Sequence, residues 1–172
     1  MAVTGFTGLN HLGLVSADVG ATIRVWADRY GVGPWQVYTF DESNMRDATV
    51  DGRPVEFAMR VALCSVSPAF SLEVIQPLDD ASPWAESLRR HGGADHLHHV
   101  RLEVAHYGDV LAHLQGLGLV KTFSATFLGV GGDEVTGTYL GTEDDLGFIL
   151  EISQASPTFE LPEPELQYPD SE

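Results

Sequence analysis

Polar and apolar residues alternate in several short stretches of the chain, and a period of two predicts β-strands. The clearest case is the stretch 95–104, DHLHHVRLEV. One face of the expected strand carries three polar residues, namely His99, Arg101 and Glu103. The opposite face is apolar, so we expect this strand to turn one side toward the core and the other toward a polar space.

Three further predicted strands have the same character. His11 lies in NHLGLVS, opposite Leu12 and Leu14. Glu73 in SLEVIQP and Glu151 in GFILEIS each lie between apolar neighbours that belong to the opposite face. Together with His99, these residues place two histidines and two carboxylates on strand faces that are backed by core positions.

The predicted elements follow an order that occurs twice. The first copy is a strand, a helix capped by Ser16 or Asp18, and three strands, expected at 9–15, 16–30, 35–40, 55–66 and 70–75. The second copy has the same order, at 99–104, 107–117, 120–127, 135–140 and 147–152. This internal repeat predicts two modules whose curled half-sheets leave an open cup between their polar faces.

The repeat also defines the expected domain. We expect one domain over residues 1–155, with module one at about 8–77, a connector at 78–94 and module two at about 95–155. A polar loop is expected near 41–54. The acidic, proline-rich tail over 156–172 is expected to be mobile or a loosely bound arm without a catalytic role.

The net charge of the chain argues against some classes of binding partner. Nine basic and 25 acidic residues give a formal net charge of −16, which repels phosphate backbones and anionic lipids. We therefore expect no nucleic-acid or membrane partner. The start of the chain lacks the pattern of a secretory signal and no apolar run approaches the roughly 20 residues of a membrane span, so a cytoplasmic protein is expected. Cys64, the lone cysteine, is expected to be a buried, inert thiol.

Four motifs in this order resemble the vicinal oxygen chelate superfamily, which includes glyoxalase I, methylmalonyl-CoA epimerase, bleomycin-resistance proteins and extradiol dioxygenases. The motifs are NHLGLVSAD, SLEVIQP, GADHLHHVRLEV and LGFILEI, within about residues 8–153. The resemblance implies an α+β fold of two paired βαβββ modules that form an open half-barrel cup. It also implies one divalent metal ion with four ligands: His11, Glu73, His99 and Glu151. His99 is preferred to His98, which strict alternation would place on the other face.

Within that superfamily, the connector and the fifth strand are most similar to methylmalonyl-CoA epimerases. Those epimerases usually have glutamine where this chain has Glu73, whereas bacterial glyoxalase I has glutamate. The resemblance thus implies an epimerase that acts on an acyl-CoA, a glyoxalase-I-like lyase, or a non-catalytic protein that binds an antibiotic or aromatic ligand. A ring-cleaving dioxygenase is less consistent with Glu73 and with the length of the chain. Members are often dimers, so we expect a homodimer.

The residue types themselves indicate the chemistry. A lone histidine or glutamate on a strand is most often structural, but here two of each recur at equivalent places of a repeat. Two imidazoles and two carboxylates suit Co, Ni, Zn, Mn or Mg. Such an ion polarises a carbonyl, and a nearby carboxylate, Glu151 or Glu73, takes the proton from the adjacent carbon, with Glu56 as a weaker third candidate.

Arginine and lysine side chains are the candidates for binding the anionic parts of a substrate. Arg101 could pair with a substrate carboxylate, or it could form an internal salt bridge with Glu103 or Glu73. Arg89, Arg90 and Lys121 are the candidates for the phosphates of a coenzyme A ester, although the two arginines also suit a solvated helix end.

Overall fold

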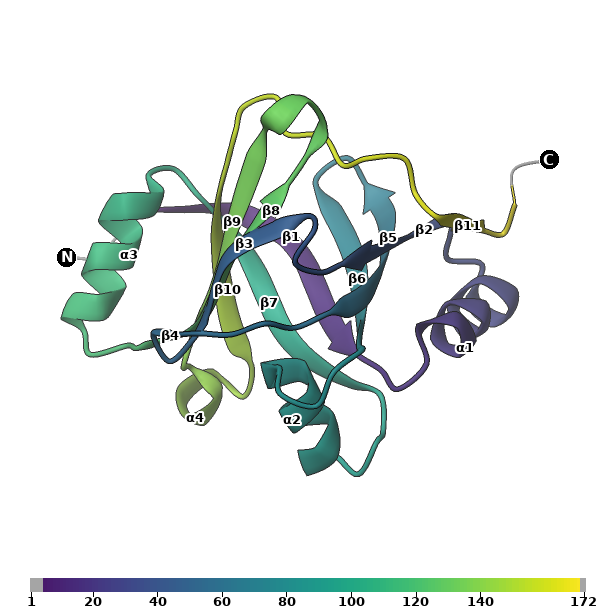
Figure 1. The fold of residues 1–172 in the computed structure, drawn as a ribbon, viewed down its shortest axis with the longest axis horizontal. Coiled ribbons are helices and arrows are strands. Elements are labelled where there is room, and N and C mark those ends of the chain that lie inside the picture. The colour runs from purple at the N-terminus through teal and green to yellow at the C-terminus, as the bar shows by residue number, and fades with distance from the viewer. Residues whose placement is uncertain (1–4, 171–172) are drawn as a thin grey trace.

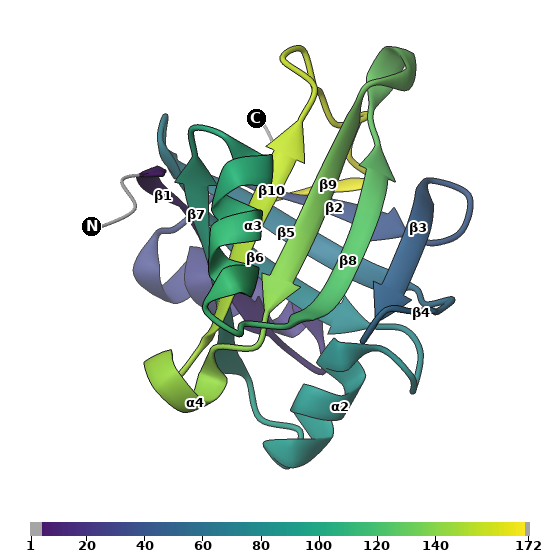
Figure 2. The same cartoon turned by 90° about the vertical axis from the view of Figure 1, so that its left-hand side faces the viewer.

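The fold is known from a computed structural model that describes residues 5–170, so the first four residues of the expected domain and the last two of the expected tail lie outside the described range. The described chain forms a single open sheet of 11 strands in the order β11-β2-β5-β6-β1-β7-β10-β9-β8-β3-β4 (Figures 1 and 2). The strands are β1 (Phe6–Val15), β2 (Trp35–Phe40), β3 (Met45–Val50), β4 (Arg53–Pro54), β5 (Met59–Ser67), β6 (Phe70–Pro77), β7 (His96–Val104), β8 (Lys121–Leu128), β9 (Glu134–Leu140), β10 (Ile149–Ala155) and β11 (Leu166–Tyr168). The helices are α1 (Val19–Arg24), α2 (Pro83–Arg90), α3 (Tyr107–Gly116) and α4 (Glu143–Leu146), with a π-helical turn over Val25–Arg29 and a 3-10 turn over Val130–Gly132.

The sheet confirms the predicted repeat. Module one contributes β1, α1, β2, β5 and β6, and module two contributes β7, α3, β8, β9 and β10 in the same order. In each module the first strand lies parallel to the last, since β1 pairs with β6 and β7 pairs with β10. The two modules meet where β1 runs antiparallel to β7. The predicted α+β architecture, with paired modules in an open half-barrel, is therefore confirmed.

Two of the helices begin at residues with the expected capping chemistry. The Asp18 side chain accepts a hydrogen bond from the Ala21 backbone N–H at the start of α1. Ser82 caps α2 in the same way, and Pro83 occupies the first helical position, where its missing N–H costs nothing. α2 closes one end of the half-barrel, because its fully buried Trp84 packs against the rings of Phe123 and Tyr139.

The stretch predicted to be a polar loop contains two strands instead. β3 pairs with β8 of module two, with Thr49 opposite Ser124 and Val50 opposite Phe123 (Figure 2). The sequence between residues 41 and 54 has little apolar alternation, so no periodic signal marks a strand there. The strand forms because β8 would otherwise be an unpaired edge, and its ladder of backbone groups is satisfied by β3.

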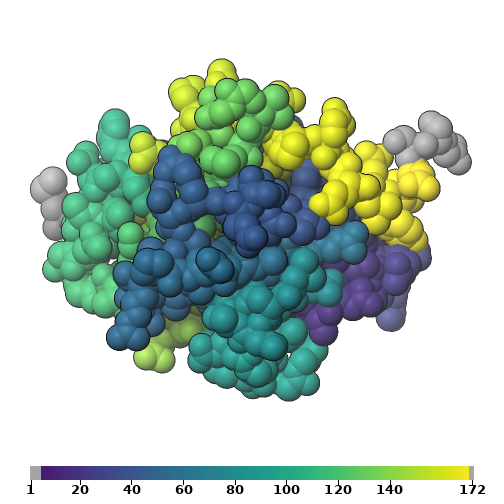
Figure 3. Space-filling model, viewed as in Figure 1, coloured from purple at the N-terminus to yellow at the C-terminus, as the bar shows by residue number. Residues whose placement is uncertain are grey.

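The tail also differs from the expected loose arm. β11 pairs antiparallel with β2, and the Glu165 backbone N–H donates to the Val37 carbonyl. The Glu165 carboxylate in turn accepts hydrogen bonds from the Thr39 backbone N–H at 2.9 Å and from its hydroxyl at 3.1 Å. Figure 3 shows the tail, in yellow, lying along the molecular surface. Backbone pairing to an edge strand needs no apolar sequence pattern, which is why composition alone suggested mobility.

Two expectations about the rest of the chain can be compared with the structure. No helix in residues 5–170 is long and apolar enough to cross a membrane. Cys64 is buried as predicted, and burial raises the pKa of its thiol.

Candidate metal centre

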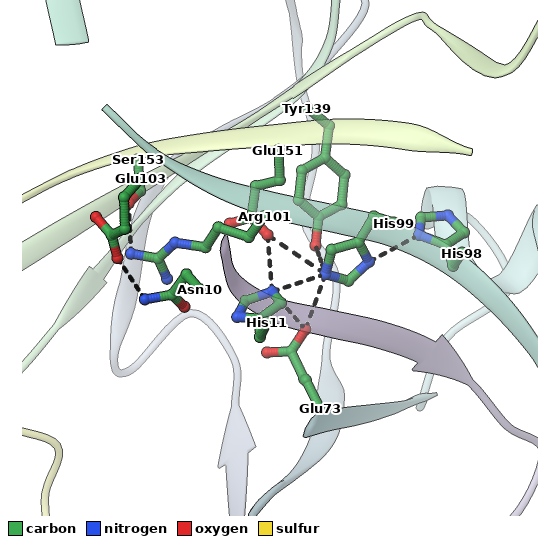
Figure 4. A network of polar contacts seen from close by, with 10 residues as sticks. All are labelled: Asn10, His11, Glu73, His98, His99, Arg101, Glu103, Tyr139, Glu151 and Ser153. Atoms are coloured by element: carbon green, nitrogen blue, oxygen red, sulfur yellow. Dashed lines mark hydrogen bonds and ion pairs between the residues drawn. The ribbon is translucent and has the colours of Figure 1, made fainter. Parts of the chain in front are cut away.

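The four candidate ligands come from the four neighbouring strands at the middle of the sheet. In sheet order they are Glu73 on β6, His11 on β1, His99 on β7 and Glu151 on β10. Figure 4 shows their side chains converging, with Glu151 above, Glu73 below and the two imidazoles between them. Each module therefore supplies one histidine and one glutamate, as the repeat predicts.

The ligand atoms lie within a few ångströms of one another. The two Nε2 atoms are 3.1 Å apart, and Glu151 Oε2 lies 3.0 Å from His11 Nε2 and 3.3 Å from His99 Nε2. Glu73 Oε2 lies 3.0 Å from His99 Nε2 and 3.6 Å from His11 Nε2. Among residues 5–170, His11, His99 and Glu151 form a group whose ligand atoms all lie within 4.8 Å of one another, and Glu73 lies outside that group although its Oε2 is near both imidazoles.

This arrangement fits a metal ion better than it fits hydrogen bonding alone. An imidazole Nε2–H has one proton to donate, yet each Nε2 faces the other Nε2 and two carboxylate oxygens. Ligand atoms about 2.1 Å from one ion lie about 3.0 Å apart at right angles and about 3.4 Å apart in a tetrahedron. Four of the five observed separations, from 3.0 to 3.3 Å, fall in that range, and the fifth, between Glu73 Oε2 and His11 Nε2, is 3.6 Å.

Neighbouring charges shift the pKa values of His11, Glu73 and Glu151 in the metal-free protein. Burial lowers the pKa of His11, but the charges of Glu73 and Glu151 outweigh it, so the net shift is upward. Burial raises the pKa of Glu73, and the His11 charge, with the hydrogen bond from His99, outweighs that effect and brings the value to about 2. The pKa of Glu151 is also lowered, chiefly by His11 against the effect of burial. Both carboxylates are thus held in the ionised form that metal binding needs.

His98 contacts the His99 ring at Nδ1, on the side away from the other ligands, although strict alternation would place His98 on the opposite face of the strand. A β-bulge between β1 and β7 brings the His98 side chain against His99 rather than onto the opposite face. The two Nδ1 atoms are 3.1 Å apart, and burial lowers the pKa of His98 well below its usual value, so its neutral ring can accept the His99 Nδ1–H. The Tyr139 hydroxyl lies 3.4 Å from His99 Nε2, and burial raises the pKa of Tyr139 well above its usual range.

The ligands form part of the wall of a cup of about 300 Å³. Its polar side includes His11, Glu73, Glu151 and Arg101. The remainder of its wall is largely apolar and includes Phe40, Met59, Val61, Leu63, Phe127, Phe159 and Leu161. A cavity with a few converging polar groups in an apolar wall is the usual form of a small-molecule site.

Arg101 points along the cup without a carboxylate partner. Within residues 5–170 it forms no ion pair, and its guanidinium donates to the Ser153 hydroxyl (Figure 4). The expected alternative, a salt bridge to Glu103 or Glu73, is wrong, because Glu103 accepts instead from the Asn10 amide. The Arg101 Nε atom is buried without a hydrogen-bond partner. The Nε–H group is thus an unused donor on a guanidinium that lines the cup.

The other charged candidates lie outside the cup. Glu56 is exposed and lines a different surface hollow. Arg89 donates to the Asp80 carbonyl, and Arg90 forms an exposed ion pair with Glu143, as expected of solvated helix ends. Neither these arginines nor Lys121 line the cup.

Sequence reasoning missed three kinds of contributor to this site. Tyr139 gives no signal in the sequence, because a tyrosine in a strand usually packs in the core. Phe159 and Leu161 lie in the tail, whose composition suggested an arm without structure. Gly13 packs directly against the His99 ring, and its position two residues after His11, on the same strand face, is the signal that could have identified it.

Comparisons with known proteins support the same fold. The profile of the glyoxalase/bleomycin resistance protein/dioxygenase superfamily matches residues 10–135. No curated protein matches the chain. Among solved structures, methylmalonyl-CoA epimerase from Mycobacterium tuberculosis is 20% identical, with a TM-score of 0.64 over 91% of this chain and 93% of that one.

Two further epimerase structures are similar to the same degree. One is a methylmalonyl-CoA epimerase in complex with methylmalonyl-CoA and NH4+, and the other is a Streptomyces coelicolor methylmalonyl-CoA epimerase variant in complex with 2-nitronate-propionyl-CoA. Each is 19% identical, with a TM-score of 0.62 over 91% of this chain and 99% of the other. Likeness at this level of identity establishes a shared fold. The profile match covers most of the chain, and the chain belongs to the glyoxalase/bleomycin resistance protein/dioxygenase superfamily.

Proposed function

We propose that this protein is a metal-dependent isomerase or lyase that moves a proton on the carbon next to a carbonyl group. The observation that carries the proposal is the convergence of two imidazoles and two carboxylates in one cup, where each carboxylate has an oxygen 3.0 to 3.6 Å from both imidazole Nε2 atoms. His11, Glu73, His99 and Glu151 would hold one divalent ion, of Co, Ni, Zn, Mn or Mg. When bound, such an ion supplies Lewis acidity that favours an enolate.

The residues of this chain supply the remaining steps. Glu73 and Glu151 both line the cup, and either can take the proton from the substrate carbon. Glu73 is the more accessible, with 14% of its side chain exposed against 7% for Glu151. Arg101, whose guanidinium lines the cup without an ion-pair partner among the described residues, holds a substrate carboxylate. The apolar wall excludes water from the reacting carbon.

The leading form of this function is an epimerase that acts on an acyl-CoA such as methylmalonyl-CoA. The proposal draws on the fold shared with epimerases and on Arg101, which suits the free carboxylate of such an acyl group. Because Arg101 is the only arginine or lysine lining the cup in the described chain, the nucleotide end of a coenzyme A ester would lie outside it. Glu73, where epimerases have glutamine, favours the glyoxalase-I-like lyase as the second candidate. A non-catalytic ligand-binding protein is the third.

Metal analysis and proton exchange test the proposal together. The protein is purified without a tag, analysed for bound metal, and then loaded with Co²⁺ in D₂O. Exchange at the substrate carbon is followed by NMR with methylmalonyl-CoA, and in parallel with the hemithioacetal of methylglyoxal and glutathione. We expect about one ion per chain and exchange with one of the two substrates.

Variants distinguish a true centre from adventitious metal. His99→Ala is expected to lose the ion, and Glu151→Gln is expected to lower both affinity and exchange. His106→Ala is the matched control, since His106 is exposed beyond the end of β7. A wild-type protein that binds none of the five metals would make the four residues structural and leave the binding-protein function in the lead.

We also propose that the protein is a homodimer. The expectation comes from the family, and sedimentation of the full chain at several concentrations tests it. A mass equal to that of one chain at every concentration would contradict it.

A further inference from the structure

The tail passes from one module of the half-barrel to the other. After β10 it runs beside the turn between β8 and β9, where the Val130 backbone N–H donates to the Glu160 carbonyl at 2.9 Å. It then reaches β2 and adds β11 to that edge of the sheet (Figure 1). We call residues 156–168 the C-terminal strap. Its anchors lie in both modules, so the strap spans the half-barrel rather than hanging from one end.

Three consecutive side chains of the strap, at residues 159–161, alternate between the cup and the solvent. Phe159 and Leu161 are half-buried and line the same cup as His11, Glu73 and Arg101. The intervening Glu160 is exposed. Leu161 also packs against the buried cluster around the cup. This alternation is that of a strand with one face on a binding site.

The approach of the strap to module two depends on a glycine. A Cβ added at Gly129 would lie 2.6 Å from the Glu160 carbonyl oxygen and 2.8 Å from the Phe159 ring. Both distances are far inside van der Waals contact, so any larger residue at this position would push the strap outward. The position of the Phe159 ring is thus fixed by direct backbone packing.

The strap therefore completes an asymmetric cup. The metal ligands and Arg101 make one side polar, whereas Phe159, Leu161 and their neighbours make the rest apolar. A ligand that fills about 300 Å³ would meet charge at one end and hydrocarbon at the other. An acid with two oxygen-bearing groups and one small apolar substituent has that shape.

We propose that the C-terminal strap is a wall of the substrate site, and that Phe159 and Leu161 limit the size of the apolar substituent that the substrate carries on its reacting carbon. The substrate class is then a carbonyl compound with a second carboxylate and a short alkyl group, either free or as the acyl part of a thioester. This inference rests on the proposed function for the identity of the reacting carbon. The wall itself follows from the cup and the path of the strap.

A series of three acids tests this limit. Methylmalonate, isopropylmalonate and benzylmalonate share two carboxylates and differ only in the substituent. Their binding to the full-length, Co²⁺-loaded protein is measured by calorimetry and by the visible spectrum of the Co²⁺ ion. One extra methylene in a tight apolar pocket changes discrimination by about 10- to 200-fold, so we expect methylmalonate to bind at least about tenfold more tightly than benzylmalonate.

Variants of the strap should remove that preference. In Phe159→Ala and in Leu161→Ala we expect the affinities for methylmalonate and benzylmalonate to differ by less than about threefold, since each substitution deletes part of the wall. Gly129→Ala should have the same effect by moving the strap, and it keeps the test valid if one of the truncated variants fails to fold. Glu160→Ala and Leu166→Ala are matched controls with exposed side chains and should retain the wild-type ratio.

The possible results separate this inference from the proposed function. If the protein takes up no metal and exchanges no proton, the proposed function fails. The wall can still be tested on the metal-free protein, because Arg101 can bind the carboxylates of the acids and calorimetry then gives the ratio of methylmalonate to benzylmalonate affinity. If exchange occurs but the strap variants retain the wild-type ratio, the wall is refuted alone. Failure of all three acids to bind would overturn the substrate class.

Discussion

Replacement of Gly13 by alanine is the sharpest available test of the metal centre. Gly13 lies opposite His99 across the β1–β7 ladder and next to Glu73 across the β1–β6 ladder. A Cβ at this position would lie 1.8 Å from Cε1, 2.1 Å from Nε2 and 2.4 Å from Nδ1 of His99. The imidazole therefore occupies the space in which any other residue would place its side chain.

The size of the effect follows from these distances. Carbon atoms in contact lie about 3.5 Å apart, so the His99 ring would have to move by about 1.7 Å. Metal–ligand distances tolerate only about 0.2 Å, so His99 would cease to be a ligand. We expect metal affinity to fall at least about 100-fold, or about 2.7 kcal/mol, and overpacking to lower the unfolding free energy by about 1 to 3 kcal/mol.

Calorimetric titration with Co²⁺ and thermal unfolding measure the two effects separately. Gly8→Ala is the matched control, because Gly8 lies in the same strand and a Cβ there would have nothing within 4 Å. Metal affinity in Gly13→Ala within threefold of the wild type would refute the reasoning, since it would mean that His99 can leave its position without loss of the ion.

Three other predictions concern the surroundings of the ligands. His98→Ala should weaken metal binding by about 10- to 100-fold, because the His99 ring loses the partner that fixes its tautomer, whereas His91→Ala should not, and a metal titration decides. In the metal-free protein the pKa of His11 is raised, so the stability that His11 contributes is complete below the usual histidine pKa of 6.5 and is lost as the pH rises through the raised pKa. The pKa of Glu73 is lowered, so the stability that Glu73 contributes is complete above the usual glutamate pKa of 4.5 and is lost as the pH falls toward about 2. Denaturant titrations of the metal-free protein should therefore show both contributions complete only between about pH 4.5 and 6.5, with stability falling on either side, and a flat profile on both sides would contradict the shifts. Arg101→Lys should raise KM for methylmalonyl-CoA by about tenfold with little change in kcat, because lysine cannot form the paired hydrogen bonds of a guanidinium, and steady-state kinetics would reveal an unchanged KM.

The parts of the structure that the sequence predicts are those with a repeated local pattern. His11, Glu73, His99 and Glu151 each stand in an alternating strand, and the repeat relates the two modules, so their convergence follows once the modules pair. Asp18 and Ser82 are recognisable caps. Such signals come from neighbours in the sequence, and tertiary contacts reinforce them.

The parts that could not be predicted depend on contacts between distant segments. β3 has no alternation of its own and forms against β8, about 75 residues away along the chain. The bulge that turns His98 toward His99 depends on a register shift between β1 and β7. The strap is held by backbone hydrogen bonds to β2, and backbone pairing leaves no trace in residue type. In each case the partner strand, rather than the local sequence, decides the conformation.

The division of the ligand set between the modules has a mechanical meaning. His11 and Glu73 belong to module one and His99 and Glu151 to module two. An ion held by all four would therefore join the two modules at a further point, in addition to the β1–β7 pairing, the β3–β8 pairing and the C-terminal strap. Such an ion would act as a cross-link whose strength depends on the free metal concentration. At a concentration a thousand times the dissociation constant, it would raise the free energy of unfolding by about 4 kcal/mol. The helices and loops of either module could then change without loosening this junction, provided that the module kept its one imidazole and one carboxylate ligand.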